Sequence, residues 1–225
     1  MAGRPPRLTR RQEQGEQSRT EILDAAARIM AAKGFDGASI SSISKESGLP
    51  ASSIYWHFAS KEGVLAAVME RGAQRFFEEL DAGDTPTNAS PADHLKAQFR
   101  TAAGAIRRDP GFLRLFILLL LSGRNDETVR RVRRVGRERV HRALRRAFDD
   151  HGATIAEEVA DELADVGLAM FDGAFLAVQN DQGLEYEPLL MAMADALAAL
   201  GETSAARRLA AAAAPRSARP RVVSR

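Results

Sequence analysis

Apolar residues recur along most of this chain at spacings of three and four, and no stretch alternates regularly between apolar and polar positions. Spacings of three and four are typical of helices that bury one face, whereas alternation would indicate strands. Proline and glycine fall mostly between the helical segments. We therefore predict an all-α protein. The predicted helices cover residues 18–34, 39–47, 50–57, 60–80, 91–108, 112–121, 126–150, 155–180 and 186–200.

The first three predicted helices form a compact pattern. Ser18 and Glu21 have the spacing of a capping box, so we expect the first helix to begin at Ser18. Gly48 separates the two short helices that follow, as a tight turn requires. Ile43, Ile54 and Phe58 are spaced to face a common core. Two short helices joined by a glycine turn are typical of a helix-turn-helix, whose second helix enters the major groove of DNA.

We divide the chain into four parts on these patterns. Residues 1–17 are predicted to be a flexible basic arm, and residues 18–64 a three-helix DNA-binding domain. Residues 65–205 are predicted to form a second helical domain, followed by a flexible basic tail over residues 206–225. The first nineteen residues contain five arginines and two glutamates. This segment either contacts phosphates or the minor groove, or is a solvated tail.

Composition narrows the class of protein. A hydrophobic content of 45% is enough for a sizeable core, and the absence of cysteine excludes disulfides and thiolate metal sites. With 32 basic and 30 acidic residues, bulk charge does not point to nucleic acid. The N-terminal residues lack the apolar segment of a signal peptide, and the apolar run 115–121 is shorter than the ~20 residues that span a bilayer. We expect a cytoplasmic protein without a membrane partner.

Catalytic signals are weak in this sequence. It contains no G-x-S-x-G, no H-E-x-x-H and no glycine-rich phosphate loop. The four histidines, His57, His94, His141 and His151, are too scattered to suggest a metal site. We therefore expect no enzymatic activity, no metal and no cofactor. The arginine-rich segment 126–150 invites a nucleic-acid interpretation, but its arginines flank an apolar stripe at helical spacing and are expected to form a solvated face.

The block from about residue 18 to 68 closely resembles the N-terminal DNA-binding domain of the tetracycline-repressor (TetR) family. The resemblance rests on the segments AAKGFDGASI, SISKESGLP and IYWHFASKEGVL. It covers a little under a quarter of the chain strongly, and the remainder only by its helical architecture. It implies a homodimeric transcriptional regulator, most simply a repressor, that binds a palindromic operator in double-stranded DNA.

The same resemblance implies which residues meet DNA. Ser39 would hold a phosphate at the start of its helix, Ser41 would face a base edge, and Lys61 would pair with another phosphate. Tyr55 and His57 would reach the DNA backbone on either side of the recognition helix. The implied contacts are Ser39, Ser41, Pro50, Ala51, Ser52, Ser53, Tyr55, Trp56, His57 and Lys61. Ala51 stands where many relatives carry a long polar residue, so recognition is expected to depend on thymine methyls, serine hydroxyls and DNA shape.

The last two predicted helices carry small and apolar residues at helical spacing. Ala169, Gly173 and Ala177 form a column that would let another helix approach closely. We expect these helices to pair with those of a second copy in a four-helix bundle, and burial within one chain is the alternative. The predicted dimer-interface residues are Val166, Ala169, Met170, Gly173, Ala177, Leu189, Met193 and Leu197.

The middle of the chain is expected to enclose an effector site. An apolar or aromatic small molecule would suit the residues available, although such residues also make plain core. The candidate lining residues are Phe99, Ala103, Phe112, Phe116, Leu120, Val140, Phe171 and Phe175. The function predicted from sequence is thus a homodimeric repressor released from its operator by this effector. The alternative is an architectural or partner-binding DNA-binding protein that responds to no ligand.

Overall fold

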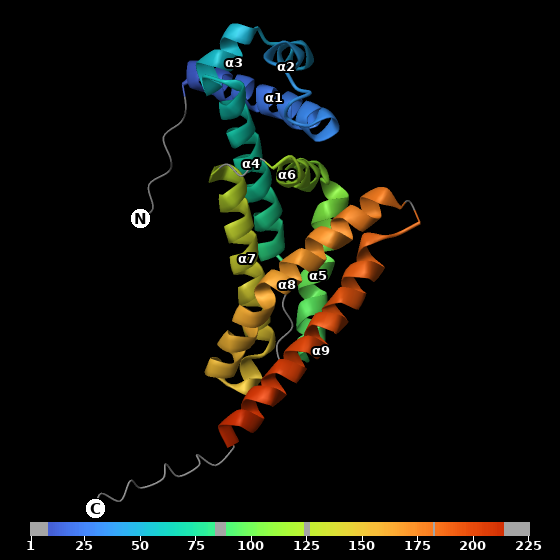
Figure 1. The fold of residues 1–225 in the computed structure, drawn as a ribbon. Helices are drawn as coiled ribbons and strands as arrows, with labels where there is room; N and C mark the ends of the chain where they lie inside the picture. The colour runs from blue at the N-terminus through green and yellow to red at the C-terminus, as the bar shows by residue number, and fades with distance from the viewer. Residues whose placement is uncertain (1–8, 84–88, 124–126, 182, 214–225) are drawn as a thin grey trace, which may run out of the picture. The chain divides into compact units, whose positions relative to one another are not determined.

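Nine α-helices and one short 3-10 helix make up the part of the chain that the structure describes, and no strand occurs there (Figure 1). The computed structural model describes residues 9–83, 89–123, 127–181 and 183–213. The helices are α1 (Arg10–Lys33), α2 (Ile40–Ser47), α3 (Ala51–Phe58), α4 (Lys61–Asp81), α5 (Pro91–Arg108), α6 (Gly111–Leu121), α7 (Glu127–Ala147), η1 (Asp149–His151), α8 (Ala153–Asn180) and α9 (Tyr186–Ala213). The all-α prediction is confirmed.

Helix α1 begins earlier than the sequence pattern predicted. Its cap is Thr9, whose hydroxyl accepts from the Gln12 amide while the Thr9 amide donates to Gln12 Oε1 at 2.8 Å. Ser18 lies inside the helix, so the predicted start there is wrong. Residues 10–17 of the expected flexible arm are therefore helical. The sequence contains two possible capping pairs, Thr9 with Gln12 and Ser18 with Glu21, and the helix begins at the first. Residues 1–8 lie outside the described residues.

Helix α9 ends later than predicted, at Ala213 instead of near Leu200. Beyond Leu200, the buried Ser204 and Ala205 continue its inward face, and Arg208 forms ion pairs with Glu158 on α8. These contacts hold the helix through a stretch that was expected in part to be flexible tail. Residues 214–225 lie outside the described residues.

The chain divides into two compact units. One unit contains Met1–Gly83 and Thr101–Val135, and the other contains Asp84–Arg100 and Gly136–Arg225. The boundary between the units passes through α5 and α7. Helical periodicity runs through both crossing points, so the sequence pattern contains no sign of them. The boundary predicted between residues 64 and 65 concerns function and stays a prediction.

The first unit has a core built around α1. Ile22 and Met30 of this helix are fully buried, as is Ile43 of α2. Farther along, Phe76 of α4 packs against Phe112 of α6, with their ring centroids 5.8 Å apart. The short helices α2 and α3 thus pack against α1, as the longer α4 and α6 do.

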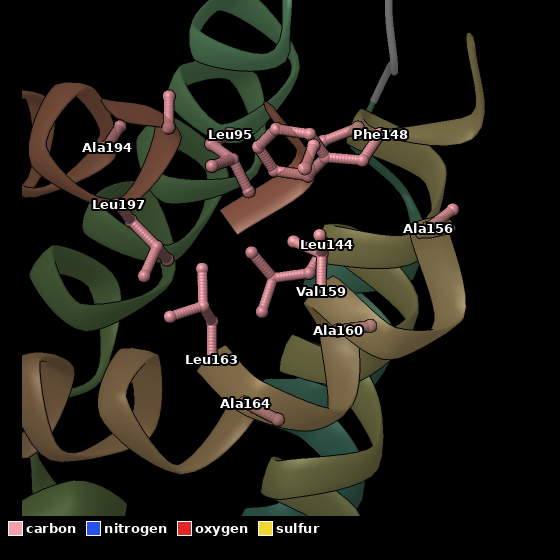
Figure 2. Packing of buried hydrophobic residues seen from close by; sticks show 13 residues of the cluster. Leu95, Leu144, Phe148, Ala156, Val159, Ala160, Leu163, Ala164, Ala194 and Leu197 are labelled. Atoms are coloured by element: carbon pink, nitrogen blue, oxygen red, sulfur yellow. The ribbon is translucent and has the colours of Figure 1, made fainter. Parts of the chain in front are cut away.

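The second unit has its own core, formed where α8 and α9 pack together with parts of α5 and α7 (Figure 2). Phe148, directly after α7, belongs to this core and is completely buried. A Cβ atom on Gly201 of α9 would overlap the Phe148 ring, and one on Gly167 of α8 would lie 2.9 Å from Val140 Cγ1. Glycine at these two positions lets the helices approach this closely.

Helix α9 is, by length and composition, long and apolar enough to cross a membrane. Its most apolar window has a mean hydropathy of 1.3, and 44% of that window is buried. The buried residues include Ala194, Leu197 and Ala198, which belong to the core of the second unit. A core helix of this kind meets the same criteria as a membrane span, so the feature is weak evidence for membrane insertion.

Gly201→Ala is expected to lower the free energy of unfolding by about 1–3 kcal/mol, because the added methyl group must displace the buried Phe148 ring. Gly15→Ala is the matched control: nothing lies within 4 Å of a Cβ at Gly15, which is also inside a helix. That control should stabilise the protein by up to about 1 kcal/mol through helix propensity. Urea unfolding at one fixed protein concentration measures both changes. Equal effects of the two substitutions would contradict the packing described here.

Candidate nucleic-acid interface

Helices α2 and α3 are joined by a tight turn whose geometry the sequence explains. Gly48 ends α2 in the left-handed conformation, with φ 70°. The Ser44 hydroxyl donates to the Leu49 carbonyl at 2.6 Å, and Pro50 precedes the first turn of α3. At the other end of α2, Ser39 and Ser42 form a capping box. The predicted helix-turn-helix is therefore confirmed.

Helix α3 has a buried face and an aromatic exposed face. Ile54 and Phe58 are buried, as the spacing predicted. Tyr55 is 53% exposed and Trp56 is 78% exposed. A protein gains free energy by burying an indole ring, so a tryptophan left so open on a short helix marks a contact surface. The arrangement presents two large aromatic side chains to a partner.

The remaining predicted DNA contacts lie on the same two helices and their ends. Ser39, Ser41, Pro50 and Ser52 are exposed. The Ser39 hydroxyl already accepts from the Ser42 amide at 3.0 Å, so it serves first as a helix cap. The half-buried members are Ala51, Ser53 and His57.

His57 lies at the end of α3, where its ring makes an edge contact with Trp56 at a centroid distance of 4.5 Å. Partial burial and the nearby Arg19 guanidinium lower the pKa of His57, and Glu16 opposes this shift. A lowered pKa favours the neutral imidazole at neutral pH. His57 is thus suited to a hydrogen bond with a phosphate more than to an ion pair.

Lys61 has other partners than the expected phosphate. Its Nζ donates to the carbonyls of Phe35 and Ala38, each at 2.9 Å, and lies 4.1 Å from the centroid of the Phe35 ring. Two of the three ammonium donors are used inside the protein, and the phosphate contact that the resemblance implies for Lys61 stays a prediction. The sequence pattern contains no sign of these contacts, which join residues 23 and 26 positions apart.

Two further residues shape this surface and were missed from sequence. The Arg19 guanidinium lies over the Phe58 ring at 5.4 Å, which places α1 beside the end of α3. A Cβ atom on Gly63 would overlap the Phe58 carbonyl oxygen, so the turn between α3 and α4 requires glycine there. A glycine three residues after Ser60, at the start of a helix, is the one sequence signal that could have indicated this close approach.

The candidate effector residues fall in both compact units. Within the first unit, Ala103 is buried and Phe112 stacks on Phe116 at a centroid distance of 6.3 Å, with Leu120 half-buried. Within the second unit, Phe175 is buried and stacks on Tyr186 at 5.9 Å. The half-buried members of the second unit are Phe99, Val140 and Phe171.

The predicted dimer-interface residues differ in their exposure to solvent. Val166 is 40% exposed, and Ala169 and Gly173 are exposed as well. Met193 and Leu197 are buried within the chain, Leu197 in the core of the second unit, and their assignment to a dimer face stays a prediction. The half-buried members are Met170, Ala177 and Leu189.

Three arginines of α7 pair with carboxylates of neighbouring helices. Arg137 Nε lies 3.1 Å from Asp165 Oδ2 and Arg145 Nε lies 2.9 Å from Glu157 Oε2, both on α8. Arg131 contacts Glu70 of α4 at 3.3 Å. These surface ion pairs fit the predicted solvated face. Among the described residues, no group of three or more histidines or carboxylates could hold a metal ion.

Comparisons with known proteins agree with this geometry. Residues 22–68 match the family model described as bacterial regulatory proteins, tetR family. The chain is 25% identical over 162 residues to the HTH-type transcriptional regulator BetI of Burkholderia mallei, covering 70% of this chain and 80% of that one. A second curated relative, the HTH-type transcriptional regulator UidR of Escherichia coli, is 35% identical over 74 residues, covering 31% of this chain and 38% of that one.

Solved structures show the same fold over most of the chain. SmeT, the repressor of a Stenotrophomonas maltophilia multidrug efflux pump, is 26% identical with a TM-score of 0.62, covering 80% of this chain and 88% of that one. A putative regulator from Saccharomonospora viridis, solved in complex with choline, is 18% identical with a TM-score of 0.64, covering 80% and 95%. The exposed second helix of the helix-turn-helix, the matching family model and these relatives lead to one conclusion: residues 22–68 are similar to the DNA-binding domain of bacterial regulatory proteins of the tetR family, and the fold of most of the chain is similar to that of solved regulators.

Proposed function

We propose that this protein is a cytoplasmic, homodimeric repressor that binds a palindromic operator in double-stranded DNA and leaves it when a small apolar or aromatic effector binds. The observation that carries the proposal is the exposure of Tyr55 and Trp56 on α3, the second helix of the helix-turn-helix. In such motifs the second helix lies in the major groove. The proposal includes no catalytic step, metal or cofactor.

The proposed DNA surface combines phosphate contacts with short base readers. The exposed N-terminus of α2, with Ser39 and Ser41, would approach phosphates and a base edge. Pro50, Ala51 and Ser52 open α3, where side chains are short enough for close approach to thymine methyls. The members that complete this surface are Ser53, Tyr55, Trp56 and His57. Because long polar readers are few, DNA shape is expected to contribute much of the specificity.

The proposed dimer surface is the exposed face of α8. Ala169 and Gly173 are exposed at four-residue spacing, and a Cβ at Gly173 would meet nothing within the chain. Val166 adds an exposed branched side chain one turn earlier. A column of small residues open to solvent supports close packing of the same helix from a second copy.

The effector is proposed from the aromatic composition of the candidate site and from the relatives. One structural neighbour was solved with choline bound, which supports small-molecule binding in proteins of this fold. An effector that changes the distance between two recognition helices would weaken binding, because half-sites lie about 34–36 Å apart or a multiple of it. That response requires the effector to bind the released state more tightly than the DNA-bound state.

The direct test is selection of bound duplexes from a random DNA pool with the purified full-length protein. Enrichment of an inverted repeat would support a dimeric, sequence-specific regulator and would supply the probe for an effector screen. If the folded protein enriches no repeat, the proposal of a sequence-specific operator fails.

Tyr55→Phe and Trp56→Ala should affect DNA binding in different ways. Tyr55→Phe removes one hydroxyl proposed to meet a phosphate, so affinity should fall by a similar factor, about 3- to 10-fold, on every duplex. Trp56→Ala removes a groove contact, so its loss should depend on the base pairs beneath α3. Fluorescence anisotropy on the selected operator and on single-base variants measures both. A base-selective effect of Tyr55→Phe, or a uniform effect of Trp56→Ala, would exchange the two assignments.

Gly173→Leu is expected to dissociate the dimer, because leucine would fill the close-approach column on α8. Gly173→Ala serves as the graded control and should leave most of the dimer intact. Sedimentation equilibrium at several concentrations reports the dimer constant for each variant. An unchanged dimer constant in Gly173→Leu would remove this face of α8 from the interface.

Operator affinity should fall steeply with salt, because neutralised phosphates release counterions. Each phosphate contact contributes about 0.9 to the slope of log K against log salt concentration. Anisotropy titrations over a range of potassium chloride give the slope. A flat response would show that no lysine or arginine neutralises a phosphate in the complex, because contacts from uncharged groups such as the Ser39 and Tyr55 hydroxyls release no counterions.

A further inference from the structure

Lys61 joins three segments of the DNA-binding helices. It is the first residue of α4, directly after the cap Ser60, whose hydroxyl accepts from the Gly63 amide at 3.0 Å. Its Nζ bonds to the carbonyls of Phe35 and Ala38, which lie in the connection between α1 and α2. The ammonium group also lies over the Phe35 ring at 4.1 Å, and that ring is 6% exposed.

These contacts end next to the proposed DNA surface. Ala38 immediately precedes Ser39, the cap of α2. With the Ala38 carbonyl held by Lys61, the position of the first turn of α2 is fixed relative to the start of α4. Helix α2 has only eight residues, so its orientation depends on such tertiary contacts.

We propose that Lys61 is a positioning residue for DNA recognition: it fixes the N-terminus of α2 and so places Ser39 and Ser41 for contact with the operator. The inference rests on the proposed DNA-binding function and refines it. Lys61 acts through α2 and not through a phosphate of its own. Hydrogen bonds from an ammonium group are stronger than those between neutral groups, and a phosphate contact that displaced them would lose two.

The turn between α3 and α4 supports this placement. The Ser60 amide donates to the Phe58 carbonyl at 2.7 Å, and Ala59 has φ 60°. A positive φ in a residue other than glycine persists only where its surroundings impose it. This turn therefore gives Lys61 a fixed base, from which its side chain reaches back to the α1–α2 connection.

The test uses Lys61→Met, which keeps the apolar stem and removes the ammonium group. Lys33→Met is the charge-matched control, since Lys33 is exposed at the end of α1. Three readouts apply to the full-length protein: operator affinity with its salt slope, amide hydrogen exchange without DNA, and a double-mutant cycle with Ser41→Ala.

We expect Lys61→Met to weaken operator binding by about tenfold while the salt slope stays at the wild-type value; loss of one direct phosphate contact would instead lower the slope by about 0.9. Exchange of the Ser42 and Ile43 amides, which bond to Ser39, should accelerate in the free protein. The affinity losses should not add, because Ser41→Ala costs less once α2 is misplaced. Lys33→Met should leave amide exchange in α2 unchanged, and it should not change the loss of operator affinity that Ser41→Ala causes.

Two results would overturn the inference. A reduced salt slope with unchanged exchange in α2 would assign Lys61 to a phosphate. If the losses of operator affinity from Lys61→Met and Ser41→Ala add, and amide exchange is faster throughout the first unit, Lys61 contributes to the overall stability of that unit and not to the placement of α2. Hydrogen exchange needs no DNA, so a protein that enriches no duplex would refute the proposed function while the coupling between Lys61 and α2 could still be measured.

Discussion

The burial of three side chains, Ile43, Ile54 and Phe58, is the constraint on which the DNA-binding surface depends. Helices α2 and α3 have eight residues each, and helices this short are not stable alone in water. They form because these side chains pack into the core that α1 supplies. Once Ile54 and Phe58 point inward, helical geometry turns Tyr55 and Trp56 toward solvent. The exposed aromatic face is thus a consequence of the buried one.

Polar contacts at helix ends then set the angles that apolar packing leaves open. The left-handed Gly48 fixes the turn, and the Ser39–Ser42 capping box fixes the first turn of α2. Lys61 bonds to the carbonyls just before that cap. Hydrophobic burial has little directionality, whereas these hydrogen bonds act at defined atoms. A surface that must match a DNA groove benefits from both kinds of contact.

The second unit combines close helix packing with a polar cluster at its periphery. Gly201 lets α9 approach Phe148, which is completely buried in the core. Nearby, hydrogen bonds from Ser204 and Arg208 lower the pKa of Glu162 to about 2, so this carboxylate stays ionised at neutral pH. The cluster links α8 to the late turns of α9. The small residues of α8 around Gly173 lie outside this cluster and are exposed, and a second copy is proposed to pack there.

The sequence by itself determined the helices and the helix-turn-helix, because periodicity, Gly48 and the spacing of Ile54 and Phe58 are local signals. Tertiary structure decided the rest. Thr9 and not Ser18 caps α1, and α9 continues to Ala213 because Ser204 and Arg208 find partners on α8.

The partners of Lys61 and the burial of Met193 and Leu197 likewise depended on which chain segments meet in space. A local pattern reports the face that a residue occupies on its own helix. It does not report what lies opposite that face, because contacts between residues far apart in the chain are set by packing. The DNA-binding helices could therefore be predicted from sequence, whereas the positioning contacts at their ends required the fold.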